Sequence, residues 1–142
     1  MIFFNDIFIH MRKKIYITST LKSEWNRTFN SLLCNKLEKI GITCHLPQRD
    51  TKQDGTDLDK FSQNIEGIKN SDQILAVGMN ESINWWLEVG YGFGSEKKII
   101  LLTNKEHSIP IMSLEMYYKI LRVDNLDDMD EYIDDLVRII RE

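Results

Sequence analysis

Cysteine and proline are scarce in this 142-residue chain, which contains two of each, and glycine occurs only seven times. Without Pro- or Gly-rich runs or low-complexity segments, the sequence leaves no room for a long linker, and we expect one domain. Cys34 and Cys44 stand in a helical and a strand pattern, which favours free thiols buried in a core. Because the chain shows no export signal, this cysteine usage predicts a reducing, cytoplasmic location.

A large excess of positive charge is also missing, since the formal net charge is −4. Proteins that bind nucleic-acid polymers or acidic membranes rely on a basic face, so we expect neither partner. A small phosphorylated ligand needs only a local anion site and stays compatible with this charge. His10, His45 and His107 have no spacing that would gather a metal, and we expect neither a metal nor a cofactor.

Long apolar runs are absent as well. The N-terminal segment MIFFNDIFIHM is apolar but too short to span a bilayer, and it lacks the basic start and cleavage site of a signal peptide. Met11 stands directly before a basic Arg-Lys-Lys run. We therefore expect residues 1–11 to be an appendage and residues 12–142 to form the folded domain.

Short β-rich runs alternate with helical repeats along the rest of the chain. Strands are expected at residues 15–18, 42–46, 73–78, 98–103 and 120–123. Each of the first two helices should face the core with one apolar side. The apolar residues are Trp25, Phe29, Leu32, Leu33, Leu37 and Ile40 in the first helix and Leu58, Phe61, Ile65 and Ile68 in the second. Ser23 should cap the first helix, Gly41 should end it, and Asn125 or Asp127 should cap the last. Residues 48–57 should form a polar loop.

This alternation predicts an α/β protein with a parallel five-stranded sheet in the order 2-1-3-4-5 and helices on both faces. Ligands of such sheets bind beyond the carboxyl ends of the strands, where the strand order reverses. The expected crevice lies between strands one and three. It is bordered by residues 18–22 on one side and residues 78–82 on the other.

Glu88 is the residue around which the chain is organised. It follows a buried strand and a polar turn, and it stands among apolar residues and the glycines Gly90, Gly92 and Gly94. Burying an unpaired carboxylate costs several kcal/mol, so an acid among apolar residues has either a functional role or a side chain that points to water. Its position beside the crevice favours the functional interpretation. Two glycines inside a helix indicate that something packs very close.

Four stretches, in this order and spacing, resemble the nucleoside 2-deoxyribosyltransferase family and its nucleotide N-glycosidase relatives. They are Lys14-Ile15-Tyr16-Ile17, Leu46-Pro47-Gln48-Arg49-Asp50, Asn70-Ser71-Asp72, and Glu88-Val89-Gly90-Tyr91-Gly92 followed by Lys97-Lys98-Ile99-Ile100. The resemblance implies a flavodoxin-like fold and cleavage of an N-glycosidic bond through a covalent glycosyl-glutamate. It assigns the nucleophile to Glu88, the acid that protonates the leaving base to Asp72, and positioning of the glutamate to Tyr16.

The sequence also departs from the family. Ser82 replaces the Asp usually found six residues before the glutamate, and Asn84 and Trp85 replace the Gly and Thr that follow. A serine there resembles the nucleotide hydrolases, in which hydroxyls and amides hold a 5′-phosphate. The residues expected to bind substrate are Thr18, Thr20, Lys22, Arg49, Ser82, Asn84 and Met112.

Two other functions remain open at this point. The segment from Ser82 to Glu88 is similar to the serine, tryptophan and glutamate pattern of TIR-like domains that act on NAD. A nucleotide-binding module without turnover is the other alternative. The sequence does not decide between transfer and hydrolysis or between nucleosides and 5′-monophosphates. By resemblance, a homodimer or larger homo-oligomer is expected, because relatives complete their sites with a neighbour's loop.

Overall fold

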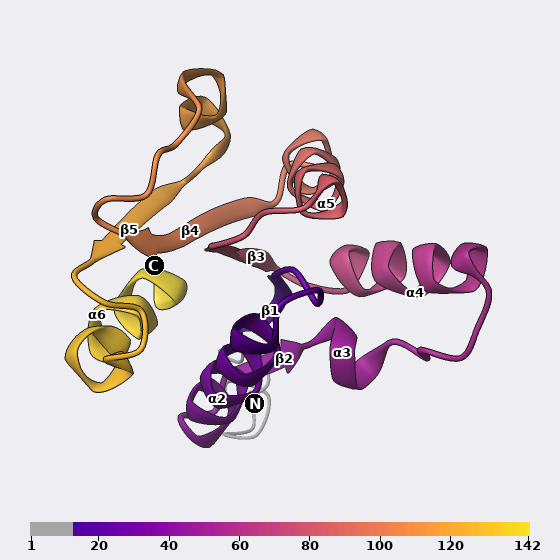
Figure 1. Ribbon diagram of the computed structural model, residues 1–142, viewed down its shortest axis with the longest axis horizontal. Helices are drawn as coiled ribbons and strands as arrows, with labels where there is room; N and C mark the ends of the chain where they lie inside the picture. The colour runs from indigo at the N-terminus through magenta and orange to yellow at the C-terminus, as the bar shows by residue number, and fades with distance from the viewer. Residues whose placement is uncertain (1–12) are drawn as a thin grey trace, which may run out of the picture.

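The computed structural model describes residues 13–142 and contains a five-stranded sheet in which every neighbouring pair of strands is parallel. Its strands are β1 (Lys14–Thr18), β2 (Thr43–His45), β3 (Gln73–Gly78), β4 (Lys98–Asn104) and β5 (Lys119–Val123). Their order is β2-β1-β3-β4-β5, as predicted (Figure 1). The predicted appendage, residues 1–11, lies outside the described residues, so its boundary stays a prediction.

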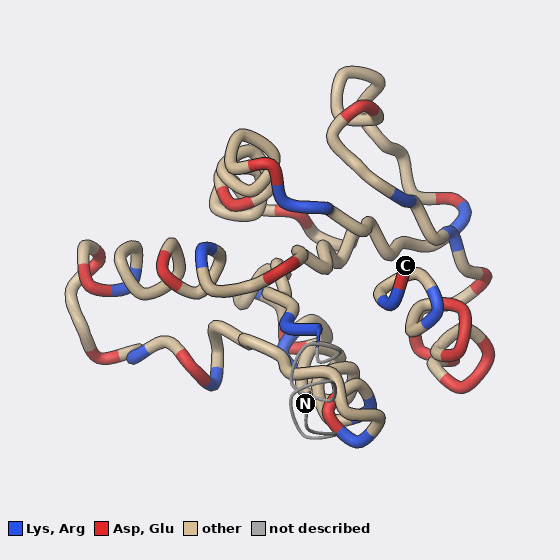
Figure 2. Tube along the Cα trace, turned by 180° about the vertical axis from the view of Figure 1, so that it is seen from behind, with Lys and Arg blue, Asp and Glu red and all other residues tan. Residues whose placement is uncertain are grey.

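Helices connect the strands and cover both faces of the sheet. They are α2 (Glu24–Lys39), α3 (Pro47–Asp50), α4 (Asp57–Lys69), α5 (Ile83–Gly94) and α6 (Met129–Arg141), with the 3-10 helix η1 (Ile111–Met116) before β5. In Figure 1, α2 and α6 lie on one side of the sheet, and α5 lies on the other. Figure 2 shows acidic residues gathered along α6.

Alternation along the central strands divides the core into two layers. Ile15 and Ile17 point to the layer closed by α2 and α6, whereas Tyr16 and Ile74 point to the layer that contains Trp85 of α5. Because β3 and β4 are covered on both faces, nearly all of their residues are buried, which explains their continuous apolar sequences.

Helix ends follow local chemistry, with one exception. Ser23 caps α2 by accepting a hydrogen bond from the Asn26 N–H, and Gly41 follows that helix with φ +97°, both as predicted. Helix α6, however, begins after Asp128 without a side-chain cap. The predicted cap Asp127 instead accepts a hydrogen bond from the Trp25 indole at 2.9 Å.

The predicted loop and helix faces also need correction. Residues 47–50 form the short helix α3, because Pro47 occupies its first turn and the Asp50 carboxylate accepts the Leu46 N–H at 2.8 Å. On α4, Leu58 and Phe61 are 71% and 62% exposed rather than inward-facing. Leu32 and Ile40 of α2 are exposed as well.

Only one of the three glycines on α5 is needed for close packing. A β-carbon at Gly92 would lie 2.1 Å from Cδ1 of buried Ile74, whereas one at Gly90 or Gly94 would meet nothing within 4 Å. Gly92 therefore lets α5 pack close to the sheet. It thereby also fixes how far Glu88, one turn earlier on the helix, lies from the strands.

Candidate active site

The Glu88 carboxylate points toward the sheet rather than to water. The Tyr16 hydroxyl donates a hydrogen bond to Oε1 at 3.1 Å, and the Thr18 hydroxyl donates to Oε2 at 3.1 Å. Tyr16 and Thr18 lie two residues apart on β1 and thus on the same face. Glu88 itself lies next to Trp85 and Val89, the buried side of α5. This arrangement places the carboxylate at the crevice between β1 and β3.

Burial changes the acidity of this group. Desolvation raises the pKa of Glu88 to about 7, and hydrogen bonds from Thr18, Tyr16 and Asn64 oppose that rise only in part. Burial, and then the neighbouring Glu88 charge, also raise the pKa of the Tyr16 hydroxyl far above its usual range. Tyr16 is therefore a hydrogen-bond donor that keeps its proton.

The imidazole ring of His45 supports the Tyr16 ring. The His45 ring stacks on the Tyr16 ring with centroids 5.1 Å apart and planes 15° apart. Burial lowers the pKa of His45, which keeps the ring neutral. Gly67 makes room for it, because a β-carbon there would lie 2.8 Å from the His45 Cε1.

Asn64 of α4 is a site residue that the sequence reasoning missed. Its Nδ2 donates to Glu88 Oε1 at 3.4 Å, and its Oδ1 accepts a hydrogen bond of 2.6 Å from the buried Thr51 hydroxyl. A signal was present, because Asn64 is a polar residue within the apolar repeat of Phe61, Ile65 and Ile68.

The loops after β1 and β3 come together at the same edge, as predicted. Buried Asn26 joins them, since its Nδ2 donates to Ser19 Oγ at 3.2 Å and to the Met79 carbonyl at 3.1 Å. These loops carry two of the predicted substrate-binding hydroxyls. Thr20 Oγ1 accepts the Lys22 N–H at 3.4 Å, and Ser82 Oγ caps α5 by accepting the Trp85 N–H at 3.2 Å.

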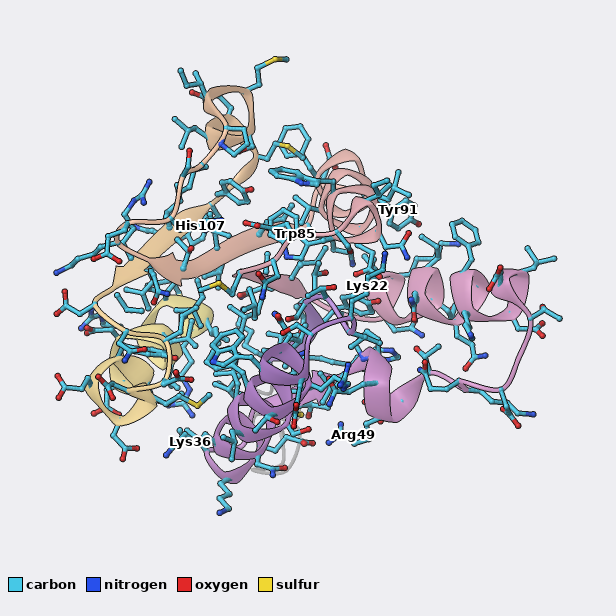
Figure 3. The ribbon with its side chains drawn as sticks, viewed as in Figure 1. Lys22, Lys36, Arg49, Trp85, Tyr91 and His107 are labelled. Carbon is cyan, nitrogen blue, oxygen red and sulfur yellow. The ribbon has the colours of Figure 1, made fainter. Side chains whose placement is uncertain are left out.

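Lys22 and Asn84 are exposed at this edge. Figure 3 shows Lys22 in the loop after β1, and Asn84 lies in the first turn of α5. The lysine is the positive group that the two loops offer to a ligand. No hydrogen bond within the described residues ties up either side chain.

The structure does not bring Asp72 into hydrogen-bond contact with Glu88. Asp72 directly precedes β3, so it lies at the amino-terminal edge of the sheet, two residues before Ile74, the strand partner of Tyr16. Its carboxylate accepts the Lys14 N–H at 2.9 Å and thereby joins the starts of β1 and β3. Asp72 thus joins two strands, and its carboxylate is not among the groups that hydrogen-bond to Glu88.

Arg49 and Met112 are not brought to Glu88 within this chain. The Arg49 guanidinium binds Glu38 at 2.5 Å and Asp50 at 2.8 Å, between α2 and α3 (Figure 3). The hydrogen bond from Arg49 holds the pKa of the Glu38 carboxyl below its usual range. Met112 is 93% exposed on η1, which is contiguous with the far edge of the sheet.

The tryptophans of α5 have a packing role. The buried Trp85 indole donates to the Val77 carbonyl at 2.9 Å, and Trp86 meets it edge-on with centroids 4.7 Å apart. Trp85 therefore fixes α5 against the end of β3. Its ring is occupied by the core and does not stack on a ligand.

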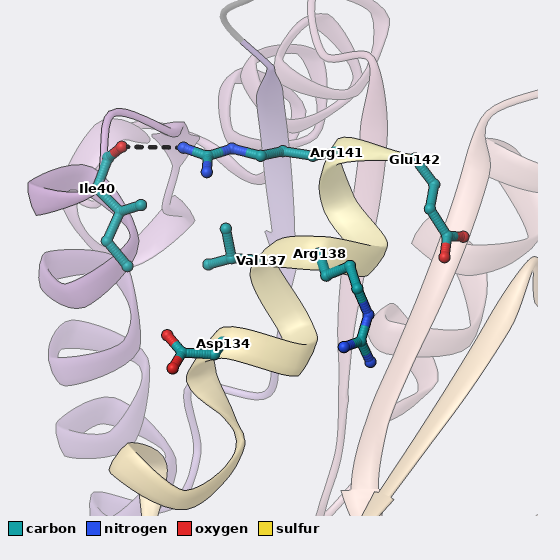
Figure 4. A pocket seen from close by; sticks show the side chains of 6 residues that line it. All are labelled: Ile40, Asp134, Val137, Arg138, Arg141 and Glu142. Atoms are coloured by element: carbon teal, nitrogen blue, oxygen red, sulfur yellow. Dashed lines mark hydrogen bonds between the residues drawn. The ribbon is translucent and has the colours of Figure 1, made fainter.

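A separate surface hollow lies at the opposite edge of the sheet. Figure 4 shows its lining, which comes from α6 and from Ile40 after α2, and the Arg141 guanidinium donates to the Ile40 carbonyl at 3.2 Å. Helices of this fold run antiparallel to the strands, so these helix ends lie far from Glu88. The charges along the hollow are mixed, and we assign it no role.

Neither a helical membrane span nor a cluster of metal ligands is found among residues 13–142. None of the helices there is both long and apolar enough to cross a membrane. In the same residues, no three His, Cys, Asp or Glu side chains are grouped as metal ligands would be.

Solved structures share this architecture at low sequence identity. A 2-deoxyribosyltransferase from Bacillus psychrosaccharolyticus is 19% identical, with a TM-score of 0.69 over 84% of this chain and 91% of that chain. The CMP N-glycosidase of Clostridium botulinum is 16% identical, with a TM-score of 0.64 over 86% of this chain and 99% of that chain. A conserved protein from Enterococcus faecalis V583 is 14% identical, with a TM-score of 0.69 over 88% and 99%.

The comparison with curated proteins gave no significant match. The sequence profile of the family described as "Nucleoside 2-deoxyribosyltransferase like" matches residues 12–106. The match includes β1, the loops around the crevice and the whole of α5. The chain therefore belongs to the nucleoside 2-deoxyribosyltransferase-like family.

Proposed function

We propose that this chain cleaves the N-glycosidic bond of a nucleoside or a nucleoside 5′-monophosphate, with Glu88 as the nucleophile. The observation that carries the proposal is the Glu88 carboxylate at the switch point of the sheet, oriented by Tyr16 and Thr18 at 3.1 Å each. An ordinary structural glutamate does not need two hydroxyl donors from one strand and a desolvated position.

In the proposed reaction, a Glu88 oxygen attacks the anomeric carbon while the bond to the base breaks. The transition state has oxocarbenium character, and the fixed carboxylate stabilises that positive charge. The product of the first step is a glycosyl ester of Glu88 and a free base. A second base that captures the sugar gives transfer, and water gives hydrolysis.

The two loops at the crevice are the proposed site for the 5′ end of the substrate. They precede the amino-termini of α2 and α5, which carry partial positive charge and favour anions. The Thr20 and Ser82 hydroxyls accept backbone hydrogen bonds and keep their protons for donation to a ligand. With Lys22 beside them, these groups favour a 5′-monophosphate over a plain nucleoside.

The test is base release from a panel of nucleosides and 5′-monophosphates, followed by chromatography with and without added adenine. Glu88→Gln keeps the shape of the side chain but removes the nucleophile, and Glu66→Gln on the exposed surface of α4 is the matched control. We expect release in the wild type and control only, and a glycosyl adduct on the Glu88 peptide by mass spectrometry. Release that survives Glu88→Gln would overturn the mechanism, and binding without release would favour a non-catalytic module.

We also propose that a second copy of the chain covers the face around Glu88. Large apolar side chains are exposed on α5, which carries Glu88, and on α4 and η1, namely Leu58, Phe61, Ile83, Leu87, Ile111 and Met112. Soluble monomers seldom expose large apolar patches. We expect a dimer or larger assembly by light scattering, and a lower mass and lower activity for Met112→Lys. A fully active wild-type monomer would contradict a shared site.

A further inference from the structure

Among residues 13–142, none of the groups that hydrogen-bond to Glu88 is able to protonate a departing base. They are the Tyr16 hydroxyl, the Thr18 hydroxyl and the Asn64 amide. Burial and the Glu88 charge make the Tyr16 hydroxyl a weaker acid by raising its pKa. A threonine hydroxyl and a carboxamide do not ionise in the range in which enzymes work.

The amide of Asn64 is locked in this orientation. The Thr51 hydroxyl, 4% exposed, lies 2.6 Å from Asn64 Oδ1, which leaves Nδ2 as the group that faces Glu88. The flipped amide would place Oδ1 against the carboxylate, where two acceptors repel each other. Thr51 is thus a positioning residue, and it holds a neutral donor beside the nucleophile.

Two other acids on the segments that follow the strands, Glu81 and Asp50, are engaged elsewhere. Glu81 follows β3 and pairs with His107 at 2.5 Å, in the loop after β4, two strands from β1. Asp50 binds Arg49 and the Leu46 N–H. Within residues 13–142, Glu88 therefore has no carboxylic acid and no cationic side chain among its hydrogen-bond partners.

This rests on the proposed function: we propose that the substrate is an N-glycoside whose base is a cation while glycosylated and a neutral molecule after release. N-ribosyl pyridinium and N7-alkylated purine compounds have this chemistry. When the bond from Glu88 to the anomeric carbon forms and the glycosidic bond breaks, the electron pair cancels the charge of the base. No proton is needed, whereas an unmodified purine or pyrimidine would leave as an anion.

A cationic base also supplies positive charge, which none of the side chains that hydrogen-bond to Glu88 provides. Glu88 is desolvated, and its three donors are neutral, so its charge is compensated only in part. A cationic base close to the carboxylate favours the ionised nucleophile. After the base has left, water attacks the anomeric carbon, Glu88 departs as a carboxylate, and the proton of the water goes to solvent.

The experiment compares substrates of matched shape. The first pair is 7-methylguanosine 5′-monophosphate against GMP, and nicotinamide mononucleotide against CMP is the second, with enzyme-free reactions as blanks. We expect kcat/KM for base release to be at least about 100-fold higher for the cationic member, since a missing general acid costs roughly 10²–10⁴-fold. Asn64→Asp supplies a proton donor next to Glu88 and should narrow that ratio at least tenfold by accelerating the neutral substrates.

The outcomes separate this inference from the proposed function. Equal rates on both members of each pair, abolished by Glu88→Gln, would overturn the inference and leave the proposed function standing. No Glu88-dependent release from any member would overturn the proposed function itself. If Asn64→Asp does not fold, the wild-type ratio still decides, because it requires no variant. A loss of activity on neutral bases in Glu81→Gln would reveal an acid at that position and would also refute the inference.

Discussion

Replacing Glu88 with glutamine should stabilise the protein at pH 8 and stabilise it much less at pH 5. The folded state raises the pKa of this carboxyl from 4.5 to about 7, mainly by desolvation. A carboxyl with a raised pKa binds its proton more tightly in the folded than in the unfolded chain. Its contribution to stability is therefore complete below pH 4.5 and is lost as the pH rises through 7. Glutamine is an isosteric mimic of the neutral acid and carries no such loss.

The size of the effect follows from the shift. A rise from 4.5 to about 7 corresponds to roughly 3 kcal/mol, at about 1.36 kcal/mol per pH unit. Glu88 is partly exposed, so solvent screening reduces this figure, and we expect about 1–2 kcal/mol at pH 8. For a chain of this length, that is a rise in Tm of roughly 3–8 °C.

Urea unfolding at pH 5, 6, 7 and 8, followed by circular dichroism, measures the difference directly. Glu66→Gln, an exposed substitution of the same type on α4, controls for the change in net charge. The gain from Glu88→Gln should grow with pH and the control should stay flat. A gain that is equal at pH 5 and 8, or a loss at pH 8, would show that Glu88 is not a desolvated carboxylate and would refute the reasoning.

Three further predictions follow from the same contacts. The kcat/KM for base release should rise with pH with a midpoint near 7, because the nucleophile must be ionised. Tyr16→Phe should move that midpoint upward, because it removes a hydrogen bond to the charged form of Glu88. A pH–rate profile of both proteins checks this. Gly92→Ala should cost about 1–3 kcal/mol in urea unfolding, because its β-carbon would lie 2.1 Å from Ile74 Cδ1, whereas Gly90→Ala, in open space, should gain up to about 1 kcal/mol. Gly67→Ala should displace the His45 ring from the Tyr16 ring, and it should lower kcat by a larger factor than it lowers the folding equilibrium constant. A kcat equal to that of the wild type would rule out a positioning role for the stacked rings.

Local and periodic signals were enough to predict the fold. Strand and helix alternation gave the parallel sheet and its order, because connections between parallel strands follow few topologies. Ser23 and Gly41 were predictable because capping and left-handed backbone depend on one residue and its immediate neighbours. Leu58 and Phe61 were misjudged, because an apolar helical repeat does not reveal whether the sheet or another surface covers it.

The residues of the candidate site likewise divide into those that the sequence predicted and those that only the structure revealed. The sequence by itself placed Glu88 beside the crevice, because a five-stranded sheet of this order brings the ends of β1 and β3 next to the helix after β3. The family resemblance added Tyr16 as the residue that positions it, and the hydrogen bond from Thr18 became visible only in the structure. Only the tertiary structure decided that Asp72 lies at the amino-terminal edge and that Asn64 faces the carboxylate. Motif similarity says which residue types occur near one another in sequence. The end of a strand at which a side chain lies, and the neighbours that desolvate it, depend on three-dimensional packing.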